Sequence, residues 1–264
     1  MMTESDMKRH IYFFLINCLL LIATSTIFVF AQENEIRNEN KQTIVVIAPH
    51  PDDAESSCGG LIANCVAAGD DVVILTMTGG EYGIWNKSPE DAKNIRTNEA
   101  VNASNILNAK VIFFGGVDAH LYVDSLNTDK LKRMLLEINP DVVLSSWPLD
   151  VHADHQSAGI LAWQVFQDKQ FHFDLYFYET TNPPHTKSFQ FVPTNYIDVT
   201  DVMEIKKSAT LQHKSQSPEE WYSLYQTLAE FRGYECDVKF AEAYIKAINS
   251  SGMGGRTSTI GKTF

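Results

Sequence analysis

The feature that most constrains the fold is the alternation of two kinds of segment along the chain. Short runs of apolar, often β-branched residues are separated by stretches in which apolar residues recur at helical spacing. The predicted strands cover residues 43–48, 72–77, 110–114, 141–146, 173–178 and 196–199. The predicted helices cover residues 56–68, 90–107, 129–138, 156–166, 202–212 and 218–231, and a segment over 241–248 closes the domain. This alternation predicts an α/β fold: a three-layer, Rossmann-like, mostly parallel sheet with helices on both faces.

The first 31 residues do not have the pattern of the predicted fold. A basic stretch at positions 8–10 precedes Ile11–Ala31, of which 17 of 21 residues are apolar, and Val29 and Ala31 place small residues at a plausible cleavage site. We expect a cleaved signal peptide, with an uncleaved membrane anchor as the alternative. The expected division is 1–31 for this segment, 32–42 for a linker, 43–249 for the enzyme domain and 250–264 for a flexible tail. The domain is therefore expected to be exported, to the periplasm or beyond the cell.

Composition narrows the classes of partner. The 264 residues carry a formal net charge of -12 and contain no block of Lys or Arg. Binding to nucleic acid or to anionic lipid headgroups is therefore not expected. What remains is a small-molecule or oligosaccharide substrate, with membrane contact only through a possible N-terminal anchor. The composition does not predict an oligomeric state.

A cluster of polar residues directly follows the first predicted strand. His50, Asp52, Asp53 and Glu55 lie on the turn between that strand and the next helix, at the carboxyl edge of the sheet, where open α/β folds bind ligands. Carboxylates here could simply complement the helix dipole, but that explanation leaves out His50. A His and an Asp three residues apart can face one divalent metal, which leaves Asp52 free for proton transfer.

A second cluster follows the strand predicted at 141–146. His152, Asp154 and His155 lie at the carboxyl end of that strand, about a hundred residues after the first cluster. In a parallel sheet the two strand ends share one edge, so the clusters can converge. Two His and one Asp would hold Zn²⁺ with an open fourth position, as catalytic rather than structural sites do. Both histidines of this cluster could reach the metal, and another divalent cation could replace zinc.

Two other motifs give weaker signals. The segment at 79–83, Gly-Gly-Glu-Tyr-Gly, superficially suggests a phosphate-binding loop, but it lacks the glycine spacing of such loops, so nucleotide binding is not expected. His213 follows a predicted helix, where the helix dipole favours a cation and a surface position is at least as plausible as a role in the site.

Taken together, these motifs resemble the LmbE-like or PIG-L family of zinc-dependent N-acetylglucosaminyl deacetylases. The resemblance extends from about residue 43 to residue 248. Its most specific elements are His50-Pro51-Asp52-Asp53-Ala54-Glu55, then Cys58-Gly59-Gly60, then His152-x-Asp154-His155. Supporting matches are Arg96-x-x-Glu99, Asp118, Lys206-Lys207, Lys214-Ser215-Gln216 and Ala241-Glu242-Ala243-Tyr244.

The resemblance implies a role for each candidate residue. His50, Asp53 and His155 would hold Zn²⁺, and Asp52 would be the general base. Protonated His152 would stabilise the oxyanion, and Asp154 would keep His152 charged and oriented. Sugar hydroxyls would be held by Arg96 and Asp118.

The implied reaction is hydrolysis of the N-acetyl group of an N-acetylglucosamine-containing sugar, giving acetate and a free amine. Intracellular thiol-cofactor synthesis, a role of some members, does not fit an exported domain, so an external or envelope glycan is the expected substrate. The alternatives are a metal-dependent hydrolase of an ester or phosphodiester, and a sugar-binding protein without catalysis.

Overall fold

The structure is a computed structural model that describes residues 41–182 and 186–248. The described residues from Gln42 to Ile248 belong to one compact unit. The predicted signal or anchor segment, most of the predicted linker and the predicted tail lie outside the described residues. Within the described part, no helix is both long and apolar enough to cross a membrane.

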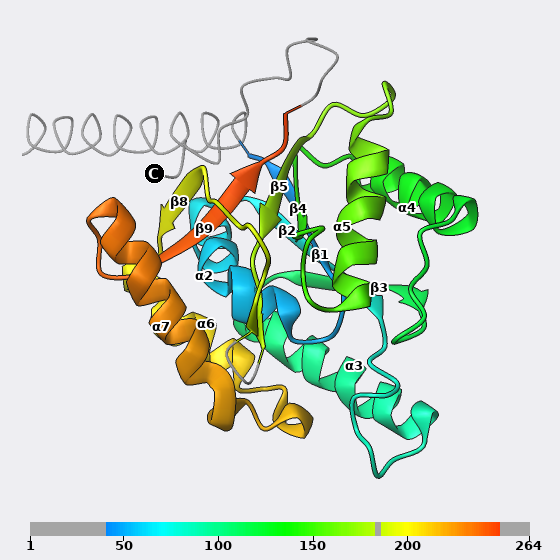
Figure 1. Cartoon of the computed structure of the whole chain (residues 1–264), viewed down its shortest axis with the longest axis horizontal. Helices are drawn as coiled ribbons and strands as arrows, with labels where there is room; N and C mark the ends of the chain where they lie inside the picture. Colours follow the sequence, from blue (N-terminus) through cyan, green and yellow to red (C-terminus); the bar gives the residue numbers. More distant parts are fainter. Residues whose placement is uncertain (1–40, 183–185, 249–264) are drawn as a thin grey trace, which may run out of the picture. The chain divides into compact units, whose positions relative to one another are not determined.

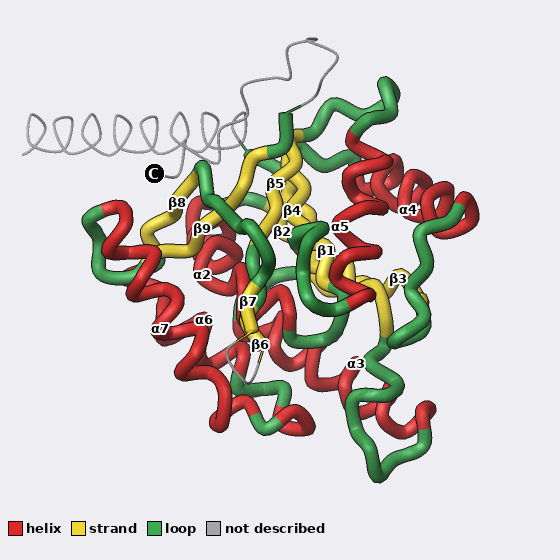
Figure 2. Tube along the Cα trace, in the orientation of Figure 1, coloured by secondary structure: helices red, strands yellow, loops and turns green. Residues whose placement is uncertain are grey.

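One seven-stranded sheet forms the centre of the fold (Figures 1 and 2). Its strands are β1 (Thr43–Ala48), β2 (Asp71–Thr78), β3 (Lys110–Gly116), β4 (Val142–Ser146), β5 (Asp174–Tyr178), β8 (Asn195–Asp198) and β9 (Ala241–Lys246). They lie in the order β3-β2-β1-β4-β5-β9-β8. Strands β1 to β5 pair in parallel, and β9 pairs antiparallel with both β5 and β8. A separate two-stranded ribbon joins β6 (Thr181–Asn182) to β7 (Thr186–Lys187).

Helices cover both faces of this sheet (Figure 1). They are α2 (Asp53–Ala68), α3 (Pro89–Ile106), α4 (Ser125–Ile138), α5 (Ala153–Phe166), α6 (Met203–Thr210) and α7 (Pro218–Cys236), with short 3₁₀ turns at Thr200–Val202 and Lys214–Gln216. Alternate side chains of β1 point to opposite faces of the sheet, and both faces are covered, which explains why the strand is apolar throughout. Val46 packs into a core with α2, α6 and α7, whereas Val45 and Ile47 pack into a second core with α4 and α5. The predicted three-layer α/β fold is confirmed.

The strand order reverses at β1, which has β2 on one side and β4 on the other. The chain therefore leaves the carboxyl ends of β1 and β4 in opposite directions, and a crevice opens between the two loops that follow these strands. Both predicted polar clusters lie on those loops and on the first turns of the helices that follow them. The topology thus brings residues 50–55 and 150–155 together.

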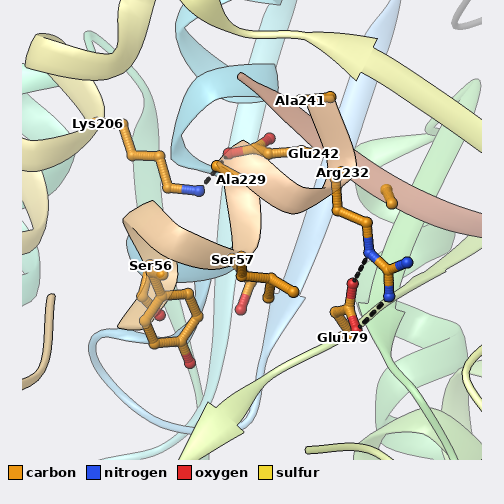
Figure 3. Close-up of a pocket in the computed structure, with 11 residues that line it drawn as sticks. Ser56, Ser57, Glu179, Lys206, Ala229, Arg232, Ala241 and Glu242 are labelled. Carbon is orange, nitrogen blue, oxygen red and sulfur yellow. Dashed lines mark hydrogen bonds and ion pairs between the residues drawn. The ribbon is translucent and has the colours of Figure 1, made fainter. Parts of the chain in front are cut away.

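Helix α2, which starts at the first cluster, is held by a buried polar network (Figure 3). The Glu242 carboxylate on β9 accepts the backbone N–H groups of Gly60 and Leu61, each at 2.8 Å, and the hydroxyl of Tyr244 at 2.8 Å. The ammonium of Lys206 on α6 completes it at 2.6 Å. A Cβ at Gly60 would lie 2.5 Å from a Val199 methyl group, so only glycine permits this close approach.

Figure 3 also shows a second ion pair beside this network. The Arg232 guanidinium on α7 donates to both Glu179 carboxylate oxygens, at 2.6 and 2.9 Å, and Glu179 directly follows β5. This two-pronged geometry fixes α7 against the sheet.

The structure corrects some element boundaries. The closing segment is strand β9, inserted between β5 and β8. Helix α4 begins four residues earlier than predicted, because the Asp124 side chain caps it by accepting the Asn127 N–H group at 2.8 Å. Helices α2 and α5 also begin three residues earlier, at Asp53 and Ala153. Asp53, Asp154 and His155 therefore lie in the first turns of helices rather than in loops.

Candidate metal centre and active site

The turn after β1 has a fixed and strained backbone. The Asp53 carboxylate accepts the backbone N–H of His50 at 2.8 Å and closes the turn. The Pro49 carbonyl accepts both the N–H and the hydroxyl of Thr78 on β2, which ties the turn to the sheet. Asp52 adopts φ 120° and ψ -25°, a conformation that non-glycine residues rarely adopt. Strain of this kind persists only where the surroundings enforce it, and it is common at functional sites.

The second cluster is positioned by the start of helix α5. His152 is the N-cap, and its Nδ1 accepts the backbone N–H of Asp154 at 3.2 Å. His155, in the first turn of the helix, is buried, and its carbonyl accepts the Ser146 hydroxyl at 2.8 Å. His152 itself is exposed, so its ring remains accessible from outside the site.

Three ligand atoms from the two clusters form a nearly equilateral triangle. His50 Nδ1 lies 3.2 Å from His155 Nε2 and 3.3 Å from Asp53 Oδ2, and His155 Nε2 lies 3.3 Å from the same Asp53 oxygen. A tetrahedral site with zinc–ligand bonds of about 2.0–2.1 Å has edges of about 3.4 Å. The triangle therefore fits one face of such a site and leaves a fourth position open.

The other nitrogen of each histidine faces a carboxylate. His50 Nε2 lies 3.1 Å from Asp118 Oδ1 and 3.1 Å from Asp154 Oδ2, and His155 Nδ1 lies 3.2 Å from Asp150 Oδ1. Metal-binding histidines commonly donate their second ring N–H to such carboxylates, which fixes the tautomer and the ring orientation. The arrangement turns His50 Nδ1 and His155 Nε2 toward a shared cation.

Two further sets of side chains could hold a metal ion, and both include His50. One is His50, His152 and His155, and the other is His50, Asp118 and Asp154. We favour the triangle with Asp53, because its three atoms are equidistant and each histidine has an outer carboxylate partner.

The charges of the site favour a bound cation. Four buried carboxylates surround the two histidines, namely Asp53, Asp118, Asp150 and Asp154. Burial alone would lower the pKa of His155, but the charge of Asp53, together with the hydrogen bonds to Asp150 and Asp53, outweighs burial and raises that pKa to about 9. The carboxylates around His50 likewise raise its pKa against the effect of burial. Burial opposes ionisation of Asp53, yet the two imidazoles hold the pKa of its carboxyl well below the usual range. The metal-free site thus holds protons where a metal could bind.

Asp52 remains outside the triangle. Its carboxylate accepts a hydrogen bond from Arg96 Nη2 at 3.1 Å and keeps a partly exposed side chain. Burial and the neighbouring Asp53 charge raise the pKa of Asp52, although the Arg96 charge opposes the shift. A partly accessible carboxylate with a raised pKa has the properties of a general base.

Arg96 holds the turn that carries Asp52. The guanidinium is buried and donates to the Pro51 carbonyl at 2.7 Å as well as to Asp52. The glycine-rich segment at 79–83 packs directly on it: a Cβ at Gly80 would lie 2.4 Å from Arg96 Nη1, and one at Gly83 would lie 2.2 Å from it. The glycines of this segment therefore cover an arginine.

The structure gives Asp118 and Asp154 different surroundings from those predicted. Asp118 is buried against His50, whose charge lowers the pKa of this carboxyl in spite of burial. Contact of Arg96 or Asp118 with sugar hydroxyls stays a prediction. The Asp154 carboxylate faces His50 and the backbone of Ala119 and Leu121 rather than the His152 ring, because the loop after β3 lies against it.

The environment of His152 opposes the protonated form that the sequence analysis predicted. The partial enclosure of this exposed side chain and the charges of His50 and His155, whose rings lie 4.7 and 5.0 Å away, lower its pKa. With Nδ1 accepting the Asp154 N–H group, the neutral ring carries its proton on Nε2. His152 can therefore donate a hydrogen bond without carrying a charge.

Sequence analysis missed two residues of this region. Asp150, in the second cluster, also accepts hydroxyl hydrogen bonds from Thr180 and from Ser188, the latter at 3.0 Å, so its role depends on residues 30 or more positions away. His213 is fully buried, with Nε2 3.3 Å from a Glu55 carboxylate oxygen, rather than exposed at a helix end.

Part of this chain matches a family profile, and several known proteins are similar to it. Residues 45–166 match the sequence profile of PIG-L, the GlcNAc-PI de-N-acetylase family. A diacetylchitobiose deacetylase from Thermococcus kodakarensis is 29% identical over 227 residues, which are 79% of this chain and 84% of that protein.

Solved structures share the fold. An N,N'-diacetylchitobiose deacetylase from Pyrococcus horikoshii superimposes with a TM-score of 0.69 at 24% identity, covering 78% of this chain and 84% of that one. A 4-carboxy-2-hydroxymuconate hydratase from Pseudomonas putida also has a TM-score of 0.69, at 23% identity, covering 78% of this chain and 96% of that one. The fold thus hosts more than one reaction, and the residues of the site must decide between them.

Proposed function

We propose that this chain, which contains a PIG-L (LmbE-like) family domain, is a metal-dependent N-deacetylase of N-acetylglucosamine-containing sugars. The observation that carries the proposal is the triangle of His50, Asp53 and His155 with the separate Asp52 carboxylate beside it. A relative with 84% of its length aligned is a deacetylase of a sugar of this class, which supports the same assignment. The export predicted from residues 1–31 extends the proposal to envelope or extracellular glycans.

The residues present fit a zinc ion. His50, Asp53 and His155 would hold it, since two imidazole nitrogens and one carboxylate oxygen are ligands that zinc takes in catalytic sites. When bound, zinc supplies Lewis acidity, which makes water a better nucleophile near neutral pH and polarises a carbonyl. Other divalent cations accept the same ligands, and availability decides which one is bound.

The chain's own residues handle the protons of the reaction. Asp52 takes a proton from the water molecule while the oxygen of that water attacks the acetamide carbonyl carbon. The Nε2–H group of neutral His152 donates a hydrogen bond to the oxygen on which negative charge develops. Removal of one such donor typically costs about 10²–10³-fold in turnover.

Collapse of the tetrahedral intermediate breaks the carbon–nitrogen bond. Asp52 returns its proton to the departing nitrogen, and the products are acetate and a free amine. Arg96 keeps the Asp52 carboxylate oriented throughout, because its Nη2 also binds the adjacent Pro51 carbonyl.

The test measures acetate and amine together, from N-acetylglucosamine, diacetylchitobiose and an N-acetylglucosaminyl conjugate. We expect equal amounts of both products and loss of the reaction on chelation. Asp52→Asn should retain the metal and lose about 10²–10⁴-fold in turnover, as removal of a general base does. His155→Ala should lose the metal itself.

Three results would contradict the proposal. Near-normal turnover by the Asp52→Asn protein would exclude this carboxylate as the base. Release of phosphate or of an alcohol without acetate would assign the site to another hydrolysed bond. Addition of water to a carbon–carbon double bond, with neither product released, would place the chain with the hydratase that shares its fold.

A further inference from the structure

A strip of exposed rings lies beside the candidate metal centre. It consists of Tyr82, His120 and Tyr122, which we call the aromatic strip. The ring centroids of Tyr82 and His120 are 5.9 Å apart, and those of His120 and Tyr122 are 6.2 Å apart. All three side chains are exposed, Tyr82 by 55% and Tyr122 by 60%. Single exposed apolar residues need no explanation, whereas three rings in series form a patch of the kind that marks a binding site.

The two loops that carry the strip are attached to the partners of His50. The backbone N–H of Tyr82 donates to Asp118 Oδ2 at 3.1 Å, and Asp118 Oδ1 faces His50 Nε2 at 3.1 Å. On the second loop, the N–H groups of Ala119 and Leu121, on either side of His120, donate to Asp154 at 2.7 and 3.2 Å.

These contacts place the strip next to the metal centre. Asp154, like Asp118, contacts His50 Nε2. Each of the two loops therefore donates backbone hydrogen bonds to a carboxylate that holds His50. His120 is itself oriented, because its Nδ1 lies 2.9 Å from the Asp118 carbonyl and must therefore donate to it. The His120 ring and the backbones of both loops are held before any ligand arrives, which lowers the entropy cost of binding.

The chemistry of the rings favours a carbohydrate. The π-face of an aromatic ring carries partial negative charge and attracts the polarised C–H groups on the face of a pyranose ring. The two phenol hydroxyls and the free His120 Nε2 can meet sugar hydroxyls at the ring edges. An anionic ligand is disfavoured by a chain of net charge -12.

We propose that the aromatic strip is a subsite for the sugar ring or rings next to the acetamido sugar that reacts. This inference rests on the proposed deacetylase function and makes it more specific: the preferred substrates are oligosaccharides rather than free N-acetylglucosamine. Each stacked ring contributes about a tenfold gain in kcat/KM, the factor expected of a good aromatic contact.

The experiment compares kcat/KM for N-acetylglucosamine and its β-1,4-linked dimer, trimer and tetramer, using the full chain. In the wild type we expect kcat/KM to rise at least tenfold from monomer to trimer. Tyr82→Ala and Tyr122→Ala should reduce the trimer-to-monomer ratio about tenfold each, and Tyr82→Phe should retain it. Neither alanine variant removes a backbone hydrogen bond. Tyr234→Ala on α7, where the side chain is 85% exposed, is the matched control and should leave the ratio unchanged.

Calorimetric binding of the trimer separates the two proposals. The protein could release no acetate from any sugar and still bind the trimer more tightly than the two alanine variants do. That result would support the aromatic strip as a sugar subsite and overturn the deacetylase function. Acetate release that is independent of chain length, with the same ratio in every variant, would overturn the strip alone. Sedimentation supplies a third outcome: an alanine variant that turns a dimer into a monomer without changing the ratio would make the strip an interface between two copies, which also overturns the subsite.

Discussion

Replacement of Asp150 by Asn should weaken metal binding without unfolding the protein. Asp150 is buried and holds His155 through its Oδ1, while its Oδ2 receives the hydroxyls of Thr180 and Ser188. An Asn can keep its oxygen toward His155 and its NH₂ group toward the two hydroxyls, which can rotate to accept. The substitution therefore removes the negative charge and little of the geometry.

The expected loss follows from two independent magnitudes. A hydrogen bond to a charged group contributes about 1.5–3 kcal/mol, which corresponds to roughly 10–150-fold in affinity. Replacement of a carboxylate behind a metal-binding histidine typically costs about 10–100-fold. We therefore expect the zinc dissociation constant of Asp150→Asn to rise about 10–100-fold.

Competition with a chromogenic chelator measures this constant. Asp168→Asn is the control, since Asp168 pairs with Lys132 at the surface, and it should bind zinc as the wild type does. Thermal unfolding of both variants shows whether the fold is kept. An Asp150→Asn protein that is folded and binds zinc within threefold of the wild type would refute the reasoning, because the carboxylate would then not act through His155.

Two further predictions concern protons and the glycine-rich segment. The pKa of His155 is raised to about 9 from an ordinary 6.5, so its contribution to stability is complete below about pH 6.5 and is lost as the pH rises toward 9. The melting temperature of the chelator-treated protein should fall over that range, and metal uptake at pH 7.5 should release protons to an indicator dye; no release and no pH dependence would contradict this account. Gly80→Ala should lower the free energy of unfolding in urea by about 1–3 kcal/mol more than Gly115→Ala does. Both glycines have positive φ, so the backbone strain is common to both variants. A Cβ at position 80 would lie 2.4 Å from Arg96, whereas one at position 115 would lie 3.5 Å from Lys130. Equal costs would mean that the contact with Arg96 is relaxed at no expense.

The fold could be predicted because its central strands are buried on both faces. The segment at 43–48 has no polar residue after Thr43, and its alternate side chains fill two separate cores, so the local pattern carries the global architecture. Strand β9 carries no such signal. Its Glu242 is buried only because Lys206, 36 residues earlier, and the N–H groups of Gly60 and Leu61 meet it.

In the candidate site, the sequence identified which residues converge but not how each is used. The position of His50 and His155 after two predicted strands indicated that both lie at one edge of the sheet, and the structure has them there. The orientation of Asp154 depends on the loop at 119–121, and the burial of His213 depends on Glu55. The same long-range packing brings Asp118 against His50, whereas a local contact makes His152 Nδ1 the acceptor of the Asp154 N–H group.

The position of β9 has a consequence for biosynthesis. It is the last described strand to be made, yet it pairs with β5 on one side and β8 on the other. A nascent chain that ends before Ala241 therefore leaves the backbone edge of β5 unpaired and gives β8 no neighbour in the sheet. Unpaired edges recruit other strands, so a chain at this stage of synthesis is exposed to aggregation. A chaperone that shields β5 until residue 246 has emerged would raise the yield of folded protein.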